Sequence, residues 1–175
     1  MSEIMNENQD NDMLQVHVAS GERVEFTKEM RKEYTILIPD MLPVHFKLLR
    51  NIFTLHGYRV GLLKNTGRKV VDTGLKYVHN DTCYPALLVI GQMISALQSG
   101  KYDVNKIALM ITQTGGGCRA SNYIHLLRKA LVKAGLGHIP VISLNLSGLE
   151  SNSGFHLTLE MLYQALIGLT YGDLF

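Results

Sequence analysis

Apolar positions recur along residues 32–175 with two spacings. Compact apolar runs such as Lys106–Ile111 are typical of buried strands in a parallel sheet, whereas Val44–His56 repeats apolar residues every three or four positions, as amphipathic helices do. Glycines follow several of the helical stretches and are expected to end them. The pattern predicts strands over 34–38, 58–63, 106–111 and 139–144, and helices over 44–56, 70–78, 86–97, 120–134 and 157–169.

The alternation of strands and helices predicts an α/β fold. Short loops between the elements favour a three-layer Rossmann-like domain over residues 32–175, with a mainly parallel sheet of four or five strands. Residues 1–31 are polar and are expected to form a tail or linker, or one added strand. In such sheets ligands bind beyond the carboxyl ends of the strands, so the segments 39–41, 113–118 and 145–150 are the expected site.

Composition narrows the class of protein. The chain has 46% hydrophobic and 18% charged residues and a formal charge of +2, and it lacks the clustered basic and aromatic residues of nucleic-acid binders. It shows neither an apolar run long enough to span a bilayer nor the basic and apolar start of a signal peptide, so a cytoplasmic protein is expected. With only two cysteines, thiol or ligand roles are favoured over a structural disulfide.

Those two cysteines lie in matching contexts, each directly before a predicted helix. Cys83 precedes Tyr84-Pro85, with Asp81 or Thr82 as the expected helix cap, and Cys118 follows Gly115, Gly116 and Gly117 and precedes Arg119. A helix N-terminus stabilises a thiolate, and a glycine turn lets backbone N–H groups approach an anion or a cluster. The plainer interpretations are a buried, inert Cys83 and a tight turn at the glycines.

Three chemistries compete for these thiols. A cysteine nucleophile needs a base, and no spacing selects one among His79, His125, His138 and His156. A zinc site needs four ligands, and the sequence has no C-x-x-C or H-x-x-x-H motif. An iron–sulfur site suits thiolates at helix N-termini, although two cysteines supply only half of the usual four ligands. The glycine segment matches neither common nucleotide-binding motif.

Several segments resemble one known family of large anaerobic proteins, the 2-hydroxyglutaryl-CoA dehydratase activator-related or acyl-CoA dehydratase activase-like proteins. The similarity spans about residues 26–175 and is carried by 80–86, 90–92, 97–103, 112–123 and 141–150, which include NDTCYPA, TQTGGGCRASNY and VISLNLSGLE. The resemblance implies a module like the subunits of dehydratases and benzoyl-CoA reductases. It implies no ATP hydrolysis, since nothing in the chain resembles the ATP-binding motifs of the activase part.

By this resemblance Cys83 and Cys118 are ligands of an iron–sulfur cluster, of the 4Fe–4S type, with Gly115, Gly116, Gly117 and Arg119 lining it. Its other ligands would come from a third residue, an exogenous ligand, a partner chain or a second copy in a homo-oligomer. The resemblance further implies an activase-like partner and an acyl-CoA substrate, with this chain as one subunit or a fragment of a larger arrangement. Whether it is itself a lyase or an oxidoreductase stays open. The alternative is a non-catalytic Rossmann-like domain for anion binding or assembly.

Overall fold

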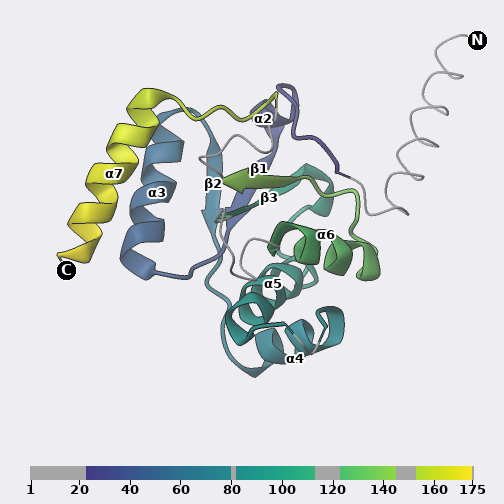
Figure 1. The fold of residues 1–175 in the computed structure, drawn as a ribbon. Helices are drawn as coiled ribbons and strands as arrows, with labels where there is room; N and C mark the ends of the chain where they lie inside the picture. Colours follow the sequence, from purple (N-terminus) through teal and green to yellow (C-terminus); the bar gives the residue numbers. More distant parts are fainter. Residues whose placement is uncertain (1–22, 80–81, 113–122, 145–152, 175) are drawn as a thin grey trace, which may run out of the picture.

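A computed structural model describes residues 23–79, 82–112, 123–144 and 153–174. Its centre is a parallel sheet of four strands in the order β2-β1-β3-β4 (Figure 1). The strands are β1 (Thr35–Ile38), β2 (Arg59–Leu62), β3 (Ile107–Thr112) and β4 (Val141–Leu144), and each pairs in parallel with its neighbours. The predicted α/β fold with a parallel sheet is therefore confirmed.

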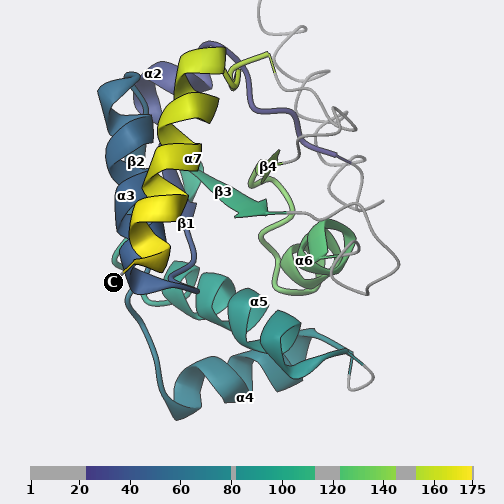
Figure 2. The same cartoon turned by 60° about the vertical axis from the view of Figure 1, so that its left-hand side comes forward.

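Helices cover both faces of this sheet. α3 (Pro43–Leu55) and α7 (Leu159–Asp173) lie on one face, and α5 (Tyr84–Leu97) and α6 (Tyr123–Lys133) on the other (Figure 1). α4 (Arg68–Tyr77) packs on α5 and lies farther from the sheet, as Figure 2 shows. Two short elements complete the described chain, α2 (Met30–Glu33) and a 3-10 turn (Val104–Lys106).

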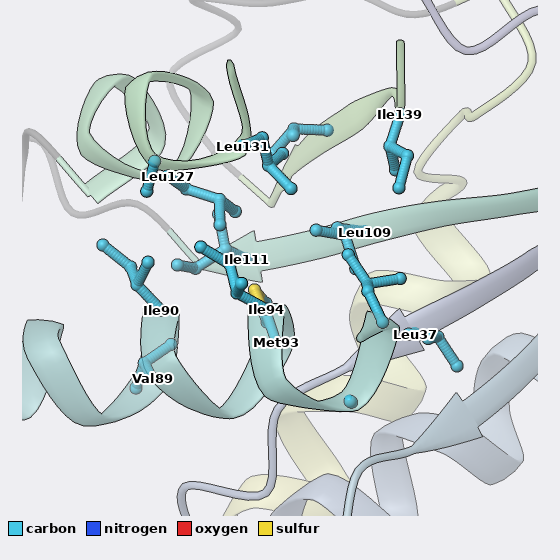
Figure 3. Close-up of a cluster of buried hydrophobic side chains, with 14 of the residues drawn as sticks. Leu37, Val89, Ile90, Met93, Ile94, Leu109, Ile111, Leu127, Leu131 and Ile139 are labelled. Atoms are coloured by element: carbon cyan, nitrogen blue, oxygen red, sulfur yellow. The ribbon is translucent and has the colours of Figure 1, made fainter. Parts of the chain in front are cut away.

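Successive strand residues point to opposite faces and so build two cores. Leu37, Leu109 and Ile111 pack with α5 and α6, where Met93, Ile94, Leu127 and Leu131 meet them (Figure 3). Residues of the other parity, Ile36 and Met110 among them, pack with α3 and α7. Burial of both faces explains why the strands read as continuous apolar runs in the sequence.

The second core reaches ahead of the first strand. Phe26 is fully buried there, and its carbonyl oxygen accepts a hydrogen bond of 2.9 Å from the Gly154 backbone N–H. Phe26 precedes residue 32, where the domain was expected to start. The segment around it is thus packed against the chain that leads into α7.

The predicted elements are present with small shifts at their ends. The helix expected over 70–78 begins two residues earlier, at Arg68, and the last helix runs from Leu159 to Asp173 rather than over 157–169. Gly57, Gly100 and Gly135 follow helices with φ of 83°, 72° and 74°, the left-handed conformation expected of glycine at a helix end. No helix in the described parts is both long and apolar enough to cross a membrane.

Candidate functional site

The sheet has one topological switch point, between β1 and β3. The chain passes from β1 to β2 on one side and then returns across β1 to form β3 on the other side. Loops leaving the carboxyl ends of β1 and β3 therefore run in opposite directions and open a crevice, which is where open α/β sheets bind ligands. Asp40 and Met41 follow β1 at this edge, and β3 ends there at Thr112.

Cys83 lies at this edge, at the N-cap of α5. Its backbone is extended, with φ of −61° and ψ of 145°, and its carbonyl oxygen accepts a 3.2 Å hydrogen bond from the Leu87 N–H. The thiol is partly exposed and does not cap the helix. The first N–H groups of α5 and the positive end of its dipole thus favour a thiolate at this position.

The cap expected at Asp81 or Thr82 is wrong, because the structure places Cys83 itself at the N-cap. Thr82 is one residue too early, since its backbone N–H bonds to the His79 carbonyl at 3.0 Å in the preceding turn. Pro85, expected in the first helical turn, does lie there. The helix starts without a hydroxyl or carboxylate cap, so its first N–H groups remain accessible to another acceptor.

A second helix N-terminus meets the first at Cys83. Its Sγ lies 3.5 Å from the hydroxyl oxygen of Tyr123, the first described residue of α6. The contact joins residues far apart in the sequence and brings the starts of the two helices together. The other predicted site residues, Gly115, Gly116, Gly117, Cys118 and Arg119, lie outside the described residues, so their placement beside Cys83 stays a prediction.

Gln92, in the middle of α5, ties the two loops of the crevice together, and sequence analysis did not find it. Its side chain accepts a hydrogen bond from the Asp40 N–H at 3.1 Å and donates one to the Asn65 carbonyl at 2.9 Å. The Asn65 side chain donates in turn to the Gln92 carbonyl at 2.9 Å and to the Ser95 hydroxyl at 2.6 Å. We call these four residues the Gln92 clamp. A buried glutamine within an apolar helix was the only signal for it.

A cavity of about 540 Å³ adjoins the clamp, which is within the usual range for small-molecule sites. It lies between the N-terminal half of α5 and the segment leading into α4, and its walls are mostly apolar, with Val70, Leu88 and Val89 among them. Asp40 also lines it, and its Oδ1 atom is buried with no hydrogen-bond partner among the described residues. That oxygen is an acceptor for a ligand N–H or O–H group.

The described residues by themselves hold no complete metal site. Among them no three histidine, cysteine, aspartate or glutamate side chains come together in a metal-binding group. Cys83 is one soft ligand with suitable surroundings, and a cluster would need further ligands from Cys118 or from another chain. The chemistry of Cys83 therefore fits a cluster but does not complete it.

Comparison with known proteins places the chain within one family. Residues 35–107 match the family model described as "CoA enzyme activase uncharacterised domain (DUF2229)". The match confirms the resemblance to the acyl-CoA dehydratase activase-like family. The activase-related segment runs from β1 to the start of β3 and so includes Cys83, the Gln92 clamp and the whole of α5. Neither the curated proteins nor the solved structures include a significant match.

Proposed function

We propose that this chain is a cytoplasmic iron–sulfur module that passes single electrons in an anaerobic acyl-CoA dehydratase or benzoyl-CoA reductase type of system. The activase-related match supports a role connected with CoA dehydratase activation. The position of Cys83 carries the proposal: a partly exposed thiol at the uncapped N-terminus of α5, beside the N-terminus of α6 and at the switch point of the sheet.

The residues have separate roles in this proposal. Cys83 and Cys118 hold iron, and the N–H groups of Gly115, Gly116 and Gly117 direct hydrogen bonds to sulfur. Tyr123 donates from its hydroxyl toward Cys83 Sγ, which stabilises negative charge on that sulfur, and Arg119 offsets the charge of the bound group. When bound, an iron–sulfur cluster supplies one-electron transfer at a potential set by such contacts.

The ligand count makes the proposal specific about assembly. The chain has two cysteines, whereas a 4Fe–4S cluster takes about four thiolates. Two copies of the chain would supply the full set if a two-fold axis passed beside Cys83. We therefore expect a cluster-bridged homodimer, with a dehydratase-type subunit as the next electron acceptor.

Iron content tests the proposal on anaerobically purified full-length protein. After iron and sulfide reconstitution we expect about four irons and four sulfides per dimer, with visible charge-transfer absorbance. Cys83→Ala should lose the iron and also the dimer, whereas the neighbouring control Thr82→Ala should keep both. Wild-type protein that stays colourless and iron-free after reconstitution would disprove the cluster.

One observation favours the alternative of an assembly domain. α7 carries large apolar side chains that are strongly exposed: Leu159 at 86%, Tyr163 at 66% and Leu166 at 56%. An apolar helix face of this kind is typical of a protein interface. Because α7 covers the sheet face opposite α5 and α6, contacts through it would leave Cys83 open (Figure 1). An iron-free dimer that survives Cys83→Ala would support this alternative.

A further inference from the structure

The cavity beside the Gln92 clamp is one end of a longer crevice. A second cavity of about 630 Å³ adjoins it, and Asn65, Thr66 and Val70 line both. We call the two together the α5 crevice. It lies between residues 64–70 on one side and α5 on the other. Each cavity is large enough for one part of a small organic ligand.

The crevice follows one face of α5 from its first turn to beyond its last. Tyr84, Leu88 and Gln92 line the first cavity, and Ser95 and Ser99 line the second. These positions are three or four residues apart, which is the spacing of a single helix face. At 1.5 Å per residue, this face is about 20 Å long. A ligand lying in the crevice would therefore be extended.

The two ends of the crevice differ in charge. Three lysines, Lys64, Lys69 and Lys101, line the second cavity, and no acidic residue is among the described residues of its wall. None of these lysines forms an ion pair within the described chain, unlike Arg68 nearby, which pairs with Asp72 at 3.7 Å. The first cavity is mostly apolar, and its one described acidic residue is Asp40 at the far end.

We infer that the α5 crevice binds a small organic phosphate ester with an apolar arm, whose phosphates lie at the lysine end and whose arm lies along the apolar cavity toward Tyr84. Exposed lysines attract phosphate at long range, and the serine hydroxyls at the same end add donors. The apolar wall at Leu88 and Val89 would exclude water from the arm. Neither end needs a bound cluster, so this inference stands apart from the proposed function.

Acyl-CoA is a suitable probe, because it combines phosphates with an apolar thioester arm. We would measure the affinity of butyryl-CoA for the full chain by calorimetry at low salt, beside inorganic diphosphate and phosphate-free S-butyryl-pantetheine. Butyryl-CoA should bind at least about tenfold more tightly than either half. Raising the salt concentration should weaken butyryl-CoA and leave the pantetheine affinity unchanged.

Paired variants locate the ligand. Lys69→Gln combined with Lys101→Gln should weaken butyryl-CoA by about tenfold, because each exposed lysine contributes a modest charge interaction. Lys47→Gln is the matched control: Lys47 is an exposed lysine on α3, which covers the opposite face of the sheet, and its loss should have no effect. Equal affinities for the double variant and wild type would overturn the inference, as would diphosphate binding as tightly as butyryl-CoA.

The same titration separates this inference from the cluster. Cys83→Ala protein, which the proposed function predicts to be iron-free, should still bind butyryl-CoA with its wild-type affinity, since Cys83 is not among the described lining residues. Iron-loaded wild-type protein that fails to bind butyryl-CoA would overturn the crevice and leave the cluster standing. Iron-free protein that binds it would do the reverse.

Discussion

The Gln92 clamp provides the sharpest test of how the site is held together. Gln92 is only 7% exposed, and both hydrogen bonds of its side chain join loops that are distant in the sequence. Gln92→Leu keeps the volume and the helix propensity but removes both bonds. The Asp40 N–H and the Asn65 carbonyl are then left facing an apolar side chain.

Two effects add up in this variant. Each lost hydrogen bond costs about 1 kcal/mol net, and each polar group left unsatisfied in a buried place costs about 1–3 kcal/mol unless water reaches it. Partial solvation at the open cavity lowers the second term, so we expect a loss of about 2–4 kcal/mol in the free energy of unfolding. With a urea slope of about 2 kcal/mol/M for a domain of this size, the midpoint falls by about 1–2 M.

Gln98 is the matched control, a glutamine that follows the same helix. Its side chain is exposed and donates to the Tyr77 hydroxyl at 2.9 Å, so Gln98→Leu should cost no more than about 1 kcal/mol. Urea unfolding followed by circular dichroism gives both values. Equal small losses for the two variants would refute the claim that Gln92 ties the loops together.

A charge at the same position gives the test a pH signature. In Gln92→Glu the introduced carboxylate can still accept from the Asp40 N–H, but it faces the Asn65 carbonyl and the Asp40 carboxylate without a proton to donate. Burial and these neighbours favour the protonated form, so the folded pKa of the new carboxyl is raised above its unfolded value of about 4.3. The variant should therefore match wild type at low pH and lose stability as the pH rises above about 4.

Two further predictions concern packing. Gly91→Ala should destabilise the domain by about 2–4 kcal/mol, because its Cβ would lie 2.3 Å from the Val70 carbonyl oxygen where α4 crosses α5, whereas Gly168→Ala, with ordinary contacts at 3.6 Å, should stabilise α7 by about 0.5–1 kcal/mol; thermal unfolding distinguishes them, and equal effects would contradict the close crossing. Phe26→Ala should cost about 3–5 kcal/mol and exposed Lys28→Ala under about 0.5 kcal/mol in the same assay, and a small loss at Phe26 would mean that this segment is not part of the core.

Periodicity predicted the framework well because this sheet is buried on both faces. Lys106–Ile111 had to be a covered strand once its apolar run was too short for a helix, and β3 occupies Ile107–Thr112. The helix over 70–78 was predicted from a short pattern and is α4, whose charged residues face solvent. Alternation alone also indicated which strand edge would hold the ligands.

The details of the site depend on tertiary contacts that a sequence pattern does not contain. Gln92 in an apolar helix becomes a clamp only because β1 and the segment before α4 end beside it. The crevice likewise depends on how closely α4 approaches α5, which is set at Gly74 and Gly91, where an added Cβ would meet backbone atoms at 2.5 Å and 2.3 Å. Cys83 was found from sequence because its signal, a thiol before a proline-led helix, is local.

α5 relates the two proposals in space. The helix has 14 residues, so its N-terminus, where Cys83 lies, is about 20 Å from the lysine end of the crevice. Because a helix is stiff, it fixes this separation and selects ligands whose phosphate lies about that far from their reacting group. A short organic phosphate held by the lysines would not reach Cys83, whereas an extended acyl thioester would place its acyl end near the thiol. Binding affinity measured against the length of the linker between phosphate and acyl group should therefore increase up to this length and then stop increasing.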